Sequence, residues 1–400
     1  MPWDIDTSLL IYSESDGRVQ DTSFAVRARK EMREEKFLDL TFALDSLTGA
    51  SPSGAVPAGT AQTFTSPSGN SQYTVPVGEP PLDSSFLDTR NALTAGWEMP
   101  LSRLTLLSVG ASLSDEFDYE HTGLNARLAH DFNDRNTTLS FGVALANDTV
   151  SPVGGSPIPL APMLGLGDYR NKAGDQSKDV TDFLIGVTQV VNRHTIVQFN
   201  YSLSQSDGYL TDPYKILSVV DPVTGVPVAG PPGSGLSLYL FESRPATRDK
   251  QSLYGLVKRD FGGNVLEASY RYMTDDWAID SHTVELRYRW NFGAERYFQP
   301  HVRFYQQTAA EFYRTVLFNG APLPTYATAD YRLGEFDGLT LGVKYGQATA
   351  RGGEWSARVE YYTQTGTPTS GSAVGALAGY DLYPDLNALI AQFTYKFGRR

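Results

Sequence analysis

Apolar and polar residues alternate with a period of two along most of the chain, and helical periodicity is nearly absent. In residues 137–146, for example, Leu139, Phe141, Val143 and Leu145 share one face, with small or polar residues between them. This alternation predicts β-strands with one apolar face. The runs hold about ten to twelve residues, whereas soluble strands average about five or six. A tilted strand that crosses a bilayer needs about nine to eleven, so run length favours membrane-spanning strands.

About sixteen such segments can be placed along the chain. We predict strands at 3–13, 18–30, 37–46, 86–98, 102–114, 118–132, 137–148, 180–191, 195–206, 250–260, 264–275, 280–292, 299–315, 338–348, 354–366 and 386–397. A further candidate, Thr328–Phe336, is short and has a poor apolar face. We place it in a loop because bacterial single-chain barrels have an even number of strands. The predicted fold is all-β: one closed antiparallel transmembrane β-barrel domain spanning residues 1–400.

The connections between these strands alternate in length. Short turns alternate with long segments rich in Gly, Pro and Ser, at 46–85, 147–178, 206–249, 316–336 and 366–385. Short periplasmic turns and long extracellular loops are typical of outer-membrane barrels. We therefore expect a bacterial outer-membrane address, with the lipid bilayer as partner. No signal peptide is recognisable at Met1, so we expect the exported protein to carry a leader that this sequence lacks.

Tryptophans support this topology. Trp3 and Trp355 begin strands and Trp97 and Trp290 end strands, all on the same side and on the lipid-facing parity. Aromatic rings gather at the headgroup level of membrane barrels. The predicted girdle comprises Trp3, Trp97, Trp290, Trp355, Tyr395 and Phe397. The alternative is that aromatic residues simply favour strand ends. Trp277 is placed in an external loop.

Composition excludes several functions. The chain has no cysteine, which rules out disulfides, thiolate metal sites, iron–sulfur clusters and covalently attached haem. The net charge is -12, and an acidic chain without a basic face is not expected to bind nucleic acid. Acidic loop residues at 115–118 and 275–276 lack the spacing of a calcium loop. We expect no metal and no cofactor.

The inward positions of the strands are charged, and the charges divide unevenly around the barrel. Acidic residues dominate the first four strands and basic residues dominate the last six. The residues expected to line a pore are Arg271, Arg287, Arg289, Arg303, Lys344, Arg358, Asp39, Asp88 and Glu98. Because lumen charges tune which solutes pass, we predict a channel or porin for small polar solutes. The alternative is that these charges pair across neighbouring strands, in a structural or partner-holding barrel plugged by its loops or by a small periplasmic lipoprotein.

An enzyme on such a barrel would need a histidine that converges with Ser or Asp. His121, near Asp118 and Glu120, is the only plausible candidate, and an ordinary loop histidine is the more common case. We therefore expect no enzymatic activity. The oligomeric state and the solute stay open.

Several segments carry a family resemblance. They are Ala329-Asp330-Tyr331-Arg332-Leu333, Leu341 to Tyr345, Ala357 to Tyr362, and the hairpin that ends at Asp16-Gly17-Arg18. They resemble an outer-membrane family catalogued as domain-of-unknown-function family 3570. The final Tyr395-Lys396-Phe397 looks like a terminal barrel strand, although three residues follow it. The resemblance implies a barrel in the outer membrane without an established activity, and a possible periplasmic redox partner.

Overall fold

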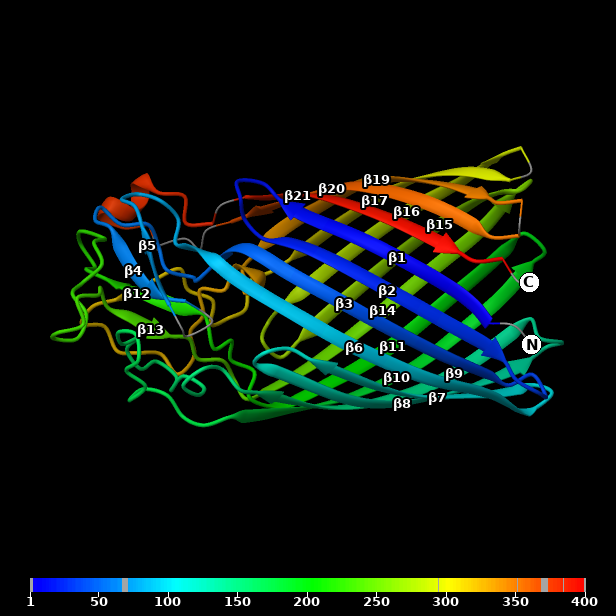
Figure 1. Ribbon diagram of the computed structural model, residues 1–400, viewed down its shortest axis with the longest axis horizontal. Helices are drawn as coiled ribbons and strands as arrows, with labels where there is room; N and C mark the ends of the chain where they lie inside the picture. The colour runs from blue at the N-terminus through cyan, green and yellow to red at the C-terminus, as the bar shows by residue number, and fades with distance from the viewer. Residues whose placement is uncertain are drawn as a thin grey trace.

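The computed structural model describes residues 3–66, 71–293, 295–350, 352–367, 373–383 and 385–398. Sixteen antiparallel strands form one closed barrel, in which β21 (Leu386–Lys396) returns to pair with β1 (Trp3–Glu14) (Figure 1). Closure leaves no free sheet edge, which is the condition for a sheet to exist in lipid. The predicted fold class and strand count are therefore confirmed. Among the described residues, no helix has the length and apolar character needed to cross a membrane.

The wall strands follow the predicted order, and several extend beyond their predicted ends. The others are β2 (Gln20–Glu31), β3 (Phe37–Pro52), β6 (Leu82–Ser102), β7 (Thr105–Asp115), β8 (Tyr119–Phe132), β9 (Thr137–Val150), β10 (Gln176–Asn192), β11 (Thr195–Gly208), β14 (Thr247–Phe261), β15 (Asn264–Asp275), β16 (Asp280–Phe292), β17 (Arg296–Gln307), β19 (Phe336–Ala348) and β20 (Glu354–Gly366).

One predicted strand is wrong at its end. We expected a strand at 299–315, but β17 stops at Gln307. The apolar residues that follow, including Ala310, Phe312 and Tyr313, are buried in a cluster instead of continuing along the wall. Their alternation reflects burial among loops, which periodicity alone cannot distinguish from a strand. The segment Thr328–Phe336 contains a single turn of 3-10 helix, η1 (Tyr331–Leu333), in agreement with the loop assignment.

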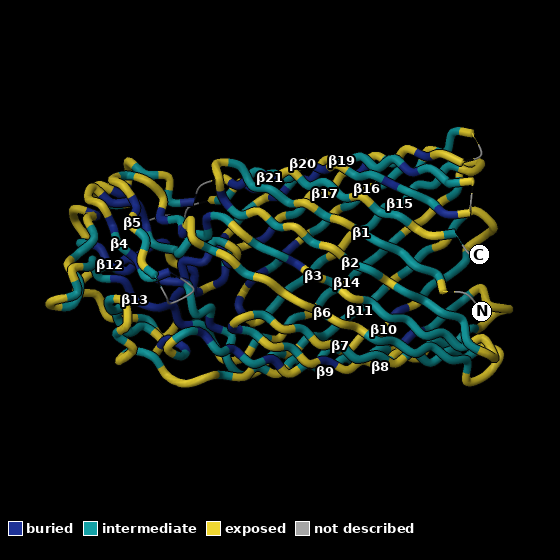
Figure 2. Tube along the Cα trace, in the orientation of Figure 1, coloured by how far each residue is buried: buried dark blue, intermediate teal, exposed yellow. Residues whose placement is uncertain are grey.

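The outer face of the barrel is an apolar belt. Leu93 is 49% exposed, Phe141 49% and Leu389 53%, and similar residues recur around the wall. Figure 2 shows exposed positions alternating with half-buried ones along the strands. Soluble monomers rarely expose continuous apolar surface of this extent. The belt suits the hydrocarbon of a bilayer, as in membrane barrels with apolar-out, polar-in strands.

The densely packed core lies at one end of the barrel. There the long connections hold β4 (Gln62–Thr65), β5 (Gln72–Val75), β12 (Ile216–Val220), β13 (Tyr239–Phe241), β18 (Leu317–Phe318) and η2 (Gly375–Gly379). We call the described residues of 53–81, 151–175, 209–246, 308–335 and 367–385 the cap. Leu217, Val220, Tyr239 and Leu377 are completely buried within it. Figures 1 and 2 place the cap over the mouth opposite the two chain termini.

Candidate functional site at the capped mouth and lumen

Backbone hydrogen bonds join the five cap segments to one another. At the centre, β12 pairs with β13 in antiparallel and with β18 in parallel orientation. The Phe241 N–H donates to the Ala161 carbonyl at 3.0 Å, and the Ala376 N–H donates to the Thr224 carbonyl at 2.7 Å. The Ile216 N–H donates to the Ser53 carbonyl at 2.9 Å. Loops that are far apart in sequence therefore form one packed body.

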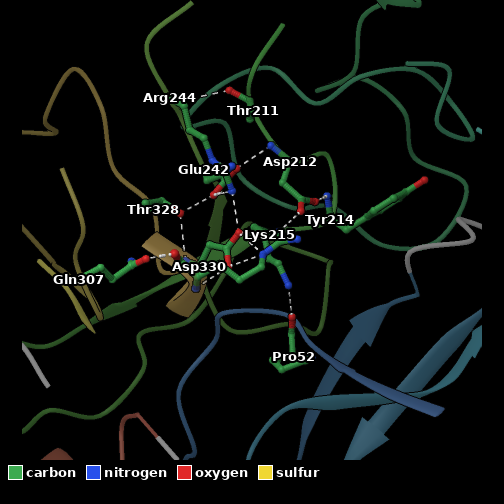
Figure 3. Close-up of polar contacts among 11 residues, drawn as sticks. Pro52, Thr211, Asp212, Tyr214, Lys215, Glu242, Arg244, Gln307, Thr328 and Asp330 are labelled. Atoms are coloured by element: carbon green, nitrogen blue, oxygen red, sulfur yellow. Dashed lines mark hydrogen bonds and ion pairs between the residues drawn. The ribbon is translucent and has the colours of Figure 1, made fainter. Parts of the chain in front are cut away.

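Six charged residues form an ionic network between the cap and the lumen (Figure 3). We call this network the latch: Asp212, Lys215, Glu242, Arg244, Asp330 and Arg332. Arg244 lies at its centre, 2.6 Å from a Glu242 oxygen and 2.8 Å from an Asp330 oxygen. Arg332 bridges Asp330 at 2.5 Å and Asp212 at 2.6 Å. The latch thus joins three stretches, 212–215, 242–244 and 330–332.

Hydrogen bonds to neutral groups also hold the latch residues in place. The Thr328 hydroxyl and the Asp212 backbone N–H both donate to the Glu242 carboxylate, at 2.5 and 2.6 Å. The Lys215 ammonium donates to the Pro52 carbonyl at 2.5 Å, which ties in the end of β3 (Figure 3). On the barrel side, the Gln307 amide donates to the Gly334 carbonyl at 2.7 Å. The latch therefore fixes the cap to the wall as well as to itself.

The charged side chains at the centre of the latch are largely buried, and their burial affects the pKa values of two carboxyl groups. The side chains of Glu242 and Asp330 are 0% and 1% exposed, and that of Arg244 is 10% exposed. Burial raises the pKa of Glu242 to about 7, although Arg244 opposes the shift. Burial would also raise the pKa of Asp330, but the charges of Arg332 and Lys215 outweigh it and hold that pKa well below its ordinary value. A buried pair of this kind is costly to break by removing one partner.

These shifts predict how cap stability depends on pH. Because Glu242 has a raised pKa in the folded cap, the cap should lose stability as pH rises from about 4.5 towards 7. Because Asp330 has a lowered pKa, its contribution should be lost as pH falls below about 3.8. Protease cleavage of the cap, measured across this range, should be slowest near pH 4 to 5. Glu242→Gln should abolish the loss on the alkaline side, and an unchanged profile in that variant would contradict the assignment.

A cavity of about 840 Å³ lies beneath the latch. Arg244, Asp330 and Arg332 form part of its lining, and strand residues such as Lys178 and Lys250 form another part. The predicted pore residue Asp88 also faces this cavity. This volume falls in the range of small-molecule sites, roughly 300–1,000 Å³. The cap and the lumen thus line a chamber at the mouth that carries both charged and apolar side chains.

On the acid-rich wall, two of the three predicted pore residues, Asp39 and Glu98, pair with arginines. Asp39 contacts both Arg27 and Arg29, with an Arg29–Asp39 distance of 3.6 Å. Glu98 lies 2.9 Å from Arg29. Opposite charges on adjacent strands stabilise a sheet. The structure therefore brings Asp39 and Glu98 together through Arg29, as the pairing alternative expects.

On the base-rich wall, two of the predicted cations also have carboxylate partners. Arg287 contacts Glu285, and Arg358 lies 3.6 Å from Glu360. His301 lies between these two carboxylates, at 2.9 Å from Glu285 and 2.7 Å from Glu360. These five side chains form a mutually compensated patch on the lumen face of β16, β17 and β20.

The other four predicted cations of this wall lie against tyrosine rings. Arg271 lies 5.3 Å from the ring centre of Tyr254, and Arg303 lies 6.0 Å from that of Tyr305. Arg289 and Lys344 share the ring of Tyr297, at 3.6 and 5.9 Å. Within the described residues, none of these four cations has an ion pair. A cation over an aromatic face keeps its charge uncompensated. We call Arg271, Arg289, Arg303 and Lys344 the cation ladder.

The predicted girdle residues lie near the short-turn end of the barrel. Trp3, Trp290 and Phe397 are 38%, 52% and 50% exposed. Trp97 pairs with Leu38, one position before the last pair of the β3–β6 ladder, and Trp355 pairs with Tyr395, so these residues also fall near the ends of ladders. Trp277, expected in an external loop, lies in the tight hairpin between β15 and β16 on the cap side, where it is only 3% exposed.

The sequence pattern did not single out the latch. Its members lie in loops, where periodicity says nothing about contacts between distant segments. One signal was present: an acidic residue two positions before an arginine occurs at Glu242-Ser243-Arg244 and again at Asp330-Tyr331-Arg332, each beside apolar residues. Paired charges among apolar loop residues indicate a buried network, because unpaired charges are rarely buried.

Comparison with solved structures gives matches of low sequence identity, among them three with TM-scores below 0.5. One match is to a bacterial polysaccharide outer membrane secretin, with 10% sequence identity and a TM-score of 0.47. The matched region covers 100% of this chain and 98% of the secretin chain. The ferric enterobactin receptor PfeA of Pseudomonas aeruginosa is 10% identical over 90% of this chain and 54% of its own, with a TM-score of 0.43. The siderophore receptor PirA of Acinetobacter baumannii is 8% identical over 91% and 53%, with a TM-score of 0.43.

No curated protein matches the chain. A family model described as "Protein of unknown function (DUF3570)" matches residues 1–397. Because that match spans almost the whole sequence, the chain belongs to the DUF3570 family.

Proposed function

We propose that the protein is an outer-membrane channel for small polar solutes, with a preference for anions, whose outer mouth is closed by its own cap. The observation that carries the proposal is the latched cap over a barrel lumen whose wall bears an uncompensated cation ladder. The apolar belt supports a membrane address. Because the family is described as one of unknown function, membership in it does not support any particular activity.

A water-filled lumen is supported by the exposure of inward-facing charges. The side chain of Arg27 is 48% exposed and that of Arg287 is 42% exposed, although both have carboxylate partners. A packed or plugged wall would bury these groups. A barrel of this strand number is wide enough to hold an aqueous channel. Solutes would therefore meet charged walls along the lumen and would stop at the cap.

The anion preference follows from how the ladder cations are held. A carboxylate partner cancels most of the charge that a passing solute experiences, whereas a tyrosine ring does not. Because the four ladder residues lie on β15, β16, β17 and β19, they form a positive tract on one wall. An anion in this tract would exchange water for guanidinium and ammonium donors.

The proposal predicts the ion selectivity of the open channel. The Arg289→Gln/Lys344→Gln double variant should lower the anion-to-cation permeability ratio by about threefold or more, because both charges over Tyr297 are lost. The measurement is the reversal potential across a potassium chloride gradient in a planar bilayer, in the Arg244→Ala background, where the cap is expected to be open.

The matched control is Lys258→Gln/Glu267→Gln on the same wall. These residues pair at 2.5 Å, so the double change removes no net charge and should leave the ratio unchanged. Equal shifts in the two double variants would overturn the role of the ladder. A membrane that stays silent in every background would instead favour the partner-holding barrel, in which a periplasmic lipoprotein or redox partner fills the lumen.

A further inference from the structure

Three residues on adjacent strands form a hydrogen-bonded chain on the lumen side near the capped mouth. The Ser112 Oγ on β7 lies 3.0 Å from Nε2 of His121 on β8. The His121 Nδ1 lies 2.7 Å from an Asp148 oxygen on β9. His121 was expected to have Asp118 and Glu120 as neighbours. The register instead sets His121 directly opposite Ser114 and Asp148, which brings Ser112 within reach diagonally.

The acid of this chain is firmly held. Asp148 is 4% exposed. Its second oxygen accepts from the Tyr119 hydroxyl at 2.5 Å and lies 3.0 Å from the Lys178 ammonium. The first oxygen, Oδ1, is therefore the one that hydrogen bonds with His121 Nδ1. This arrangement fixes the imidazole, so that Nδ1 carries the proton shared with Asp148 and Nε2 faces the serine.

The serine and the histidine pack over a glycine. Gly123 is directly opposite Ser112, and a Cβ at this glycine would lie 2.6 Å from the Ser112 Oγ and 3.0 Å from the His121 Nε2. A side chain at this position would collide with both groups, so the contact between Ser112 and His121 requires a glycine here. The His121 side chain is 28% exposed, which shows that the chain is open to solvent.

The chain also adjoins the chamber under the cap. Tyr119 and Lys178, which hold Asp148, are part of the lining of the 840 Å³ cavity. A side-chain amide is available on the same face, because Asn125 lies opposite Gly110, where its amide approaches to 2.9 Å of the position that a Cβ would take. Strand N–H groups are used in the sheet, so an oxyanion would have to be stabilised by such a side chain.

We propose that Ser112, His121 and Asp148 form a catalytic triad that hydrolyses carboxylic esters small enough to enter the lumen. Ser112 Oγ attacks the ester carbonyl carbon while His121 Nε2 takes the hydroxyl proton. The tetrahedral intermediate collapses, the alkoxide leaves with the proton from His121, and an acyl-serine remains. Water, deprotonated by His121, then attacks the acyl-serine and releases the acid and free Ser112. Asp148 stabilises the imidazolium in both steps.

This inference goes beyond the proposed channel and does not require ion conduction. The test is reaction of the purified full chain in detergent with a small fluorophosphonate probe, followed by mass spectrometry of the adduct. The expected result is a single adduct on Ser112. Ser112→Ala and His121→Ala should give none, and Asp148→Asn should slow labelling at least about a hundredfold by disturbing the imidazole.

Ser114→Ala is the matched control, since Ser114 shares the face and strand of Ser112 and lies opposite His121 without hydrogen bonding to it in the structure. It should label at the wild-type rate. Heat-dependent migration in gels verifies that each variant keeps its barrel. Hydrolysis of p-nitrophenyl butyrate should show a burst that the same variants remove.

Labelling is repeated in the Arg244→Ala background, so that a closed cap cannot hide the site. No adduct on Ser112 in either background would overturn the triad. An adduct on Ser112 that persists at full rate in His121→Ala, or an adduct on another serine, would also overturn it. A labelled protein in a silent membrane would leave the triad standing and would refute the channel.

Discussion

Liposomes that carry the Arg244→Ala variant are expected to swell at least about tenfold faster in a small neutral sugar than liposomes that carry the unmodified protein. Arg244 is the shared partner of Glu242 and Asp330, whose side chains are 0% and 1% exposed. Its removal takes away the cation that opposes the raised pKa of Glu242, so Glu242 must either bind a proton or stay buried as an unpaired carboxylate, and Asp330 loses one of its arginines. Breaking a buried pair by removing one partner costs about 3–5 kcal/mol, a large share of the stability of a body as small as the cap.

Two further variants separate loss of the latch from a general defect. Arg170→Ala removes another cap arginine that is 79% exposed and, among the residues that the structure describes, has an ion pair with Asp168 alone, so swelling should stay at the wild-type rate. Adding Glu242→Gln to Arg244→Ala replaces the carboxyl group that has lost its cation with a neutral amide and should restore much of the closure. If liposomes that carry Arg170→Ala swell at the same rate as liposomes that carry Arg244→Ala, the latch does not hold the cap in place.

Trp277→Ala is expected to destabilise the cap by about 3–5 kcal/mol, as large-to-small substitutions of buried aromatic residues do. Trp277 packs edge-to-face against Phe312 at 5.1 Å. Its indole N–H donates to the Thr247 carbonyl at 2.9 Å, and the Arg248 guanidinium lies 4.4 Å from the ring centre. The substitution removes these contacts where the β15–β16 hairpin supports the cap.

The measurement is limited trypsin digestion in detergent, with cleavage sites read by mass spectrometry. Cleavage after exposed Arg314 should accelerate strongly in Trp277→Ala, while the barrel strands stay protected. Val223→Ala is the control, because Val223 is an apolar cap residue that is 79% exposed. An unchanged rate at Arg314 in Trp277→Ala would show that the hairpin does not support the cap.

The barrel could be predicted because its wall obeys one simple period. A strand between lipid and water must alternate, so residues such as Leu139 and Phe141 revealed their strand without any tertiary information. The predicted strand was wrong at residues 308–315, where apolar residues are buried in a core formed by loops. Alternation there has the same appearance but a different cause, since Phe312 and Tyr313 pack against the cap and not against lipid.

The chemistry of the site could be predicted only in part. The inward cations followed from strand parity, but whether each would meet a carboxylate or a tyrosine ring depended on register. Arg287 and Arg289 are two residues apart on one strand, yet one contacts Glu285 and the other Tyr297. The latch and the Ser112–His121–Asp148 chain join residues from separate loops or strands, and the sequence does not show which distant residues meet; for the latch it shows only the repeated spacing of an acidic residue and an arginine.

If the cap closes the outer mouth of an otherwise open barrel, its removal should open a pore. This can be tested by the single-channel conductance of the unmodified, purified protein in a planar bilayer at neutral pH, recorded beside Arg244→Ala. We expect almost no steady conductance for the unmodified protein and a large, anion-preferring conductance for the variant. A large, steady conductance of the unmodified protein, equal to that of the variant, would contradict it.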